Sequence, residues 1–99
     1  MWHTPSIDVL RIDGAGRTVS LSGTPLKLTP KEFDLLHLLA RHPGRVYSRE
    51  DLLQRIWGLD QGGGDRMVDD HIGHLRKKLG PFGDRVTTVW AVGYKLRAE

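Results

Sequence analysis

Cysteine is absent from this chain of 99 residues, which excludes disulfide bonds and thiolate metal ligands. No apolar run approaches the roughly 20 residues that a membrane-spanning helix needs. The start, MWHTPS, is too short and too polar to be a signal peptide. We therefore expect a cytoplasmic protein with one compact domain at residues 7–99, preceded at 1–6 by a linker or an expression remnant.

Signatures of catalysis are also missing. The chain has no GxSxG motif, and the glycines at 62–64 lead into Asp65 rather than the Lys-Ser/Thr of a phosphate-binding loop. Ser48 is better explained as a helix cap than as a nucleophile. We therefore expect no enzymatic activity and no cofactor.

Charge is not dominated by one sign, but it is unevenly distributed. The formal net charge is +3, and residues 1–65 contribute none of it, since 8 Lys/Arg balance 8 Asp/Glu. Residues 66–99 hold 7 Lys/Arg against 4 Asp/Glu, which accounts for the whole excess. A local basic surface indicates an anionic partner, although a solvated charged face is the simpler alternative.

Short strands are predicted at both ends of the chain. Residues 7–12, 17–21 and 25–28 are separated by Asp-Gly and Ser-Gly turns, which predicts three antiparallel strands with Pro25 at the start or the edge of the last. Residues 86–96 read as two strands around a tight turn near 91–93.

Three helices are predicted between the strands. Thr29, Pro30 and Glu32 form a capping-box signature, and the helix after them ends at His42-Pro43-Gly44. A second helix begins at Ser48 and stops at Gly58. A third helix, capped by Asp65, covers 66–79 and ends at Gly80-Pro81.

The third helix has two distinct faces at 100° per residue. Its apolar residues, Val68, Ile72, Leu75 and Leu79, share one face, which we expect to be buried. Nearly opposite lie Arg66, Asp70, Gly73, His74 and Lys77, with Asp69, His71, Arg76 and Lys78 on the flanks. Such a helix suits the DNA major groove, where the outer face meets base edges and the flanks meet phosphates.

Two features of this helix have competing explanations. A glycine inside a helix costs about 1 kcal/mol relative to alanine, so Gly73 either permits close approach to a groove or is simply tolerated. His71 and His74 lie one turn apart beside Asp69 and Asp70, which could suggest a metal. The chain has no HExxH motif and no matching third ligand, so we expect polar surface and no metal site.

The sequence resembles the C-terminal winged-helix effector domain of OmpR/PhoB-type response regulators. The resemblance rests on LTPKEFDLLHLLARHPGRVYSREDLLQRIWG (28–58), RMVDDHIGHLRKKLG (66–80) and VTTVWAVGYKL (86–96). It implies an α+β winged helix-turn-helix fold with a small N-terminal antiparallel sheet, three helices and a C-terminal β-hairpin wing. In that family the third helix enters the major groove and the wing touches the adjacent minor groove.

The resemblance also implies roles for individual residues. The base-facing set is Asp70, Gly73, His74 and Lys77, and the set on the DNA backbone is Trp57, Arg66, His71, Arg76, Lys78, Thr88 and Tyr94. Trp90 lies at the wing tip, and Leu59, Asp60, Gln61 and Gly62 belong to a loop through which such proteins touch RNA polymerase. A core role for Trp57 and a plain connecting role for the loop are the alternatives.

Three departures from the family pattern matter. Asp70 stands where an apolar residue is common, and it could accept from a cytosine amine or else repel DNA. The wing has Trp90-Ala91 instead of Arg-Gly, so Trp90 could pack on sugars or in the core. The phosphorylatable receiver domain of such a regulator would precede residue 1, which implies an excised effector domain.

The sequence thus predicts specific binding of double-stranded DNA as the output of a two-component phosphorelay that controls transcription. Two copies of the chain are expected on direct-repeat half-sites. A winged helix that binds an acidic protein and a non-specific nucleic-acid binder remain the alternatives.

Overall fold

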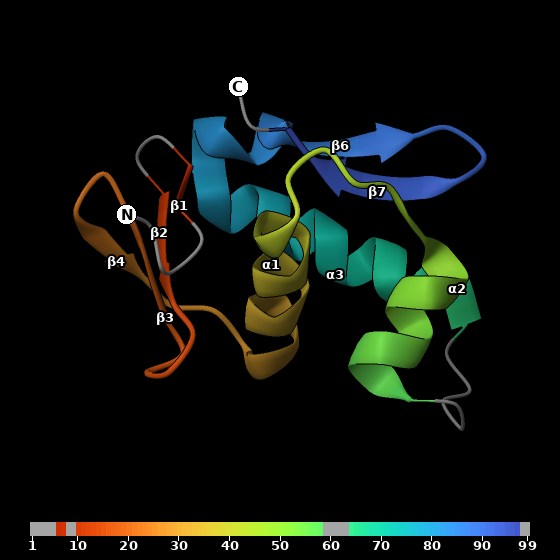
Figure 1. Ribbon diagram of the computed structural model, residues 1–99, viewed down its shortest axis with the longest axis horizontal. Coiled ribbons are helices and arrows are strands. Elements are labelled where there is room, and N and C mark those ends of the chain that lie inside the picture. Colours follow the sequence, from red (N-terminus) through yellow and green to blue (C-terminus); the bar gives the residue numbers. More distant parts are fainter. Residues whose placement is uncertain (1–5, 8–9, 59–63, 98–99) are drawn as a thin grey trace.

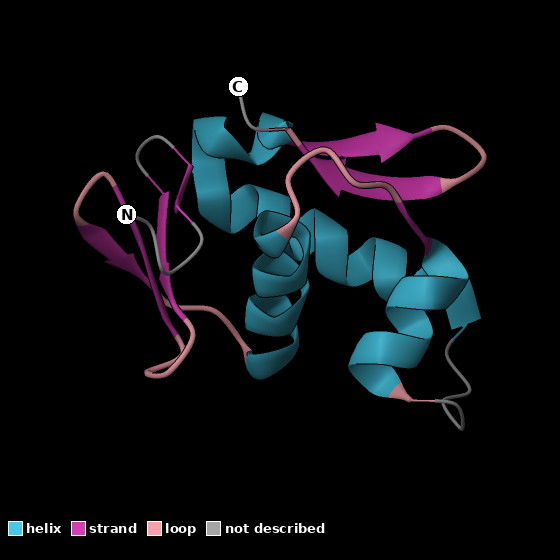
Figure 2. Ribbon diagram, in the orientation of Figure 1, coloured by secondary structure: helices cyan, strands magenta, loops and turns pink. Residues whose placement is uncertain are grey.

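The computed structural model describes residues 6–7, 10–58 and 64–97. An N-terminal sheet lies at one end, α1 crosses the middle, and a second sheet runs along α3 (Figure 1). The bounds are β1 (Ser6–Ile7), β2 (Leu10–Asp13), β3 (Thr18–Leu21), β4 (Thr24–Leu26), α1 (Pro30–Arg41), β5 (Tyr47–Ser48), α2 (Arg49–Leu52), the π-helical η1 (Leu53–Trp57), α3 (Gly64–Leu79), the 3₁₀ segment η2 (Gly80–Arg85), β6 (Val86–Val89) and β7 (Gly93–Leu96). The predicted order of strands, helices and hairpin is confirmed (Figure 2).

The N-terminal sheet is antiparallel in the order β1-β2-β3-β4. The prediction of one continuous strand at 7–12 is wrong, because Ile7 and Leu10 pair with each other and divide the segment into β1 and β2. Asp8 was the one turn-forming residue in this segment, and without a Gly or Pro beside it the break was missed. The other two turns are confirmed, and Pro25 lies on β4 at the edge, where its missing N–H breaks no ladder bond.

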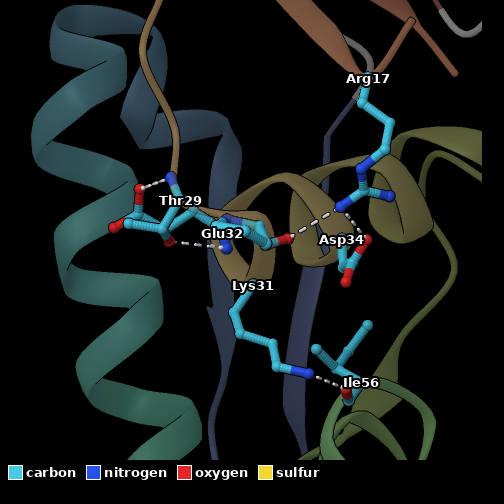
Figure 3. Close-up of polar contacts among 7 residues, drawn as sticks. Arg17, Thr29, Lys31, Glu32, Asp34 and Ile56 are labelled. Carbon is cyan, nitrogen blue, oxygen red and sulfur yellow. Dashed lines mark hydrogen bonds and ion pairs between the residues drawn. The ribbon is translucent and has the colours of Figure 1, made fainter.

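Helix α1 begins with the predicted capping box. Thr29 Oγ1 accepts from the Glu32 amide at 3.3 Å, and Glu32 Oε1 accepts from the Thr29 amide at 2.9 Å (Figure 3). The helix then buries the apolar residues Phe33, Leu35, Leu36, Leu39 and Ala40. Its buried face meets the inner stripe of α3, so these two helices form the centre of the core.

The predicted second helix consists of two segments. Ser48 caps α2 as expected, since its hydroxyl accepts from the Asp51 amide at 3.0 Å. The chain then widens into η1, where the Gly58 amide donates to both Leu53 O and Gln54 O at 3.1 Å. No residue pattern predicts this π-helical turn, a form that is rare and often found at functional sites.

Helix α3 begins at Gly64, so Asp65 lies within the helix rather than at the predicted cap position. It ends at Leu79 as predicted, and Gly80 follows with a φ of +60°, the left-handed conformation typical of a residue after a helix. No helix among the described residues is long and apolar enough to cross a bilayer.

The C-terminal hairpin belongs to a three-stranded sheet with the order β5-β7-β6. The predicted hairpin is confirmed, and its turn closes with a bond from Val92 N to Val89 O at 2.9 Å. Strand β5 was not predicted, because two residues are too few to show a period. A Cβ on Gly93 would overlap Tyr47 O and approach Ser48 Cα to 2.8 Å, so only glycine lets β5 and β7 pair here.

Candidate nucleic-acid interface

The inner stripe of α3 is buried as predicted. Val68, Ile72, Leu75 and Leu79 are at most 1% exposed. The four residues therefore anchor α3 in the core and fix which side of the helix is left for a partner.

The opposite face of α3 is open. Arg66, Asp70, His74 and Lys77 are exposed, and a Cβ on Gly73 would meet nothing within 4 Å. Nothing inside the fold therefore requires glycine at position 73. The close-approach explanation and the tolerance explanation both stay open.

One flank of α3 packs against an aromatic and a lysine. The Trp57 ring meets the His71 ring edge-on, with centroids 4.9 Å apart, and Lys31 Nζ lies 5.8 Å from the Trp57 centroid. Lys31 also donates to Ile56 O at 2.8 Å, which ties α1 to the end of η1 (Figure 3). His71 Nδ1 lies 2.9 Å from Met67 O. Trp57 is half-buried, so it is neither a full core residue nor freely exposed.

The other flank is bonded to the hairpin. Arg76 donates to Val86 O through Nε at 2.8 Å and through Nη2 at 2.6 Å, and Nη2 also donates to Thr88 Oγ1 at 2.9 Å. The guanidinium lies 5.6 Å from the centroid of the Tyr94 ring. These bonds fix the hairpin relative to α3 and occupy two groups, Arg76 and Thr88, that were expected on the DNA backbone.

A second connection between α3 and the hairpin runs through Asp69. Its Oδ1 accepts from Tyr94 Oη at 2.6 Å and from Arg49 Nε at 2.9 Å. Burial and the neighbouring Asp69 carboxylate raise the pKa of Tyr94 despite the opposing effect of Arg49. Because the Tyr94 hydroxyl donates its hydrogen bond to Asp69, it could donate to a phosphate only by breaking that bond.

Lys78 is also engaged within the fold. Its ammonium donates to Glu32 Oε1 at 2.7 Å, and the Glu32 residue is only 3% exposed. Burial raises the pKa of Glu32, but the bonds from Lys78 and from the Thr29 amide outweigh it, so the pKa lies below its ordinary value. The charged pair joins α3 to the start of α1.

The tip of the hairpin presents an exposed aromatic side chain. Trp90 is 85% exposed, so the alternative that it packs in the core is wrong. Ala91 beside it has a φ of +67°, which is unusual for a residue with a side chain. The expected wing tip is therefore apolar and accessible.

Comparison with known proteins identifies the family. The family model described as "Transcriptional regulatory protein, C terminal" matches residues 23–96. The chain is 48% identical over 89 residues to the phosphate regulon regulatory protein PhoB of Escherichia coli (strain K12), covering 88% of this chain and 39% of that one. It is 52% identical over 85 residues to the uncharacterized transcriptional regulatory protein YclJ of Bacillus subtilis (strain 168), covering 81% of this chain and 36% of that one.

Solved structures agree. The crystal structure of the Klebsiella pneumoniae RstA DNA-binding domain in complex with the RstA box matches with a TM-score of 0.87 at 37% identity, covering 99% of this chain and all of that one. The chain belongs to the OmpR/PhoB family of response regulators, as a C-terminal winged-helix DNA-binding domain. Its predicted fold and DNA-binding function are thereby confirmed, and the family consists of transcriptional regulators rather than enzymes.

Within this OmpR/PhoB-type domain, the individual contact residues stay predictions. The base-facing residues lie together on one open face, whereas Arg76, Lys78, Thr88 and Tyr94 have intramolecular partners. Leu59, Asp60, Gln61 and Gly62, expected to touch RNA polymerase, lie outside the described residues. Among the residues that the structure covers, no group of three His, Asp or Glu side chains could hold a metal ion.

Sequence reasoning missed the residues that fix the winged helix from inside. Arg49, Asp69 and Lys31 hold α2, α3, η1 and the wing together, yet none was assigned a role. Asp69 was noted only as a flank of the helix and as a neighbour of the two histidines. A flank position borders the buried stripe, and that alone was a signal that its side chain could bond to a neighbouring element.

Proposed function

We propose that the domain binds specific double-stranded DNA with the outer face of α3 in the major groove and the wing against the adjacent minor groove. The observation that carries the proposal is the open face itself. Asp70, His74 and Lys77 project from a helix whose other side is fully buried, and Gly73 adds no bulk between them. Hydrogen-bonding side chains on such a face can reach base edges.

The proposed contacts divide by chemistry. Asp70, His74 and Lys77 read bases, and Arg66, His71 and Trp57 meet the backbone. Arg76, Lys78, Thr88 and Tyr94 have partners inside the fold, so we propose that they orient the helix and the wing before any contact with DNA. Trp90 meets the sugar edges of the minor groove, because it lacks the charge that draws arginine there.

The chain spans 36% and 39% of the length of the two curated relatives named above. We propose that the domain is the output of a two-component phosphorelay in the cytoplasm, joined to a receiver domain. Two copies occupy direct-repeat half-sites, because one recognition helix reads too few base pairs for useful affinity. The segment at 59–62 contacts RNA polymerase.

Selection from random duplexes tests the proposed mode. The purified domain should enrich one motif, and its affinity for that motif should fall steeply as salt rises. Competition with random duplex and with RNA separates specific binding from general nucleic-acid binding. If random duplex and RNA competed as well as the selected duplex, binding would be non-specific. If the domain bound no nucleic acid, the protein-binding alternative would be supported.

A further inference from the structure

The protonation of the His71 ring can be deduced from its partner. Nδ1 lies 2.9 Å from the Met67 carbonyl oxygen, which can only accept a hydrogen bond. Nδ1 must therefore carry a hydrogen in every protonation state that keeps this bond. In the neutral ring Nε2 is then bare and can act only as an acceptor.

The second ring nitrogen has no partner in the described part of the chain. His71 is half-buried, and its printed hydrogen bond runs from Nδ1 to the Met67 carbonyl oxygen. Nε2 is therefore the nitrogen of this ring that is left for a ligand.

The ring orientation is held from several sides. Trp57 packs edge-on from η1, and Lys31 of α1 lies over the Trp57 ring. On α3 itself the centroids of the His71 and His74 rings are 6.3 Å apart. Lys78 lies about two turns further along the helix, where it forms an ion pair with Glu32.

A phosphate oxygen, like a carbonyl, can only accept. Contact between a phosphate and Nε2 of neutral His71 would bring two hydrogen-bond acceptors together with no hydrogen between them. We propose that His71 is a phosphate-binding residue that acts only as the imidazolium, so that DNA binding by this domain takes up a proton. The inference rests on the proposed function, since it requires DNA along this flank of α3.

The expected effect follows from linkage. Uptake of one proton can strengthen binding by at most about tenfold for each pH unit of acidification. Histidine ordinarily changes charge between pH 5 and 8. We therefore expect affinity for the selected duplex to be several-fold higher at pH 6 than at pH 8.

Two substitutions separate the two ring nitrogens. His71→Gln places an amide N–H near the position of Nε2, so it can donate to phosphate without taking up a proton. His71→Asn places an amide near Nδ1, which keeps the Met67 bond but does not reach the phosphate. His42→Gln is the matched control, because His42 is an exposed histidine at the end of α1 and not on α3.

The experiment measures the dissociation constant of the selected duplex from pH 6 to 8 by fluorescence anisotropy, at one ionic strength. Circular dichroism checks the fold of each variant. His74→Gln, alone and combined with His71→Gln, measures how much of the pH dependence comes from His74 instead of His71. We expect His71→Gln to lose one proton of the pH dependence and to bind at least as well as the unchanged domain at pH 8. His71→Asn should lose the same dependence and bind more weakly at pH 6.

Three results would overturn the inference. Retention of the full pH dependence in both His71 variants would remove His71 from the proton uptake while leaving DNA binding intact. Failure of every protein to bind the selected duplex at any pH would overturn the proposed function along with it. The His42→Gln profile should overlay that of the unchanged domain, and loss of its slope would place the titration elsewhere.

Discussion

The substitution Lys78→Ala tests whether Lys78 stabilises the folded domain or binds a DNA phosphate. Lys78 Nζ lies 2.7 Å from Glu32 Oε1, and the Glu32 carboxylate is nearly inaccessible to water. Removing the ammonium leaves that carboxylate with the Thr29 amide as its remaining partner. A hydrogen bond to a charged group contributes about 1.5–3 kcal/mol. Since the Lys78 side chain is itself 38% exposed, the lower figure applies.

We therefore expect Lys78→Ala to lower the free energy of unfolding by about 1.5 kcal/mol. This corresponds to a decrease in Tm of roughly 6–12 °C for a domain of this size. Thermal unfolding followed by circular dichroism at pH 7 measures it. The loss should shrink in acid. The pKa of Glu32 is lowered in the fold, so its contribution is present above its unfolded-state value and is lost as the pH falls through the folded-state value.

DNA binding supplies the second readout. Each phosphate contact that is removed lowers the slope of log affinity against log salt by about 0.9. We expect no such change for Lys78→Ala, whereas Lys77→Ala should alter affinity and base preference with Tm unchanged. If Lys78→Ala lowered the salt slope by one contact and left Tm intact, Lys78 would be a phosphate ligand and the structural assignment would be refuted.

Three further substitutions or conditions test the packing of the domain. Gly93→Ala should cost about 3 kcal/mol or more, because its Cβ would overlap the Tyr47 carbonyl and force β5 from β7, and urea unfolding measures the loss. Tyr47→Phe should leave the domain equally stable or stabilise it by about 1 kcal/mol, since the buried Tyr47 hydroxyl has no hydrogen-bond partner in the described part of the chain; a clear loss of stability in the same assay would reveal an unrecognised partner. Burial lowers the pKa of His37, and the nearby Arg41 and Arg17 lower it further. As the pH falls, His37 therefore takes up a proton at a higher pH in the unfolded chain than in the folded one. Stability should therefore fall as the pH drops below about 6.5, and His37→Gln should reduce that fall, as measured by Tm from pH 7.5 to 5.5.

Much of the fold could be predicted because its determinants are local. Thr29 and Glu32 lie one turn apart, so their reciprocal bonds can be predicted from four consecutive residues. The inner stripe of α3 follows from helical periodicity alone. The division of 7–12 into two strands and the pairing of β5 with β7 involve two-residue strands, which are too short to show a period in the sequence.

The candidate site was predictable on its outer face and not on its flanks. Asp70, His74 and Lys77 lie opposite the buried stripe, so their exposure follows from geometry. A flank residue can turn outward to a phosphate or inward to a neighbouring element, and periodicity cannot decide between the two. Arg76 and Lys78 turn inward because carbonyl and carboxylate oxygens stand within reach on β6 and α1.

Amide chemical shift mapping tests the central claim most directly. The ¹⁵N-labelled domain is titrated with the duplex obtained by selection, and the perturbed amides are located on the structure. We predict that the largest changes fall on the outer face of α3, at Asp70, Gly73, His74 and Lys77, with smaller changes at the wing tip. Changes confined to the N-terminal sheet and α1, with that face of α3 unaffected, would contradict the account.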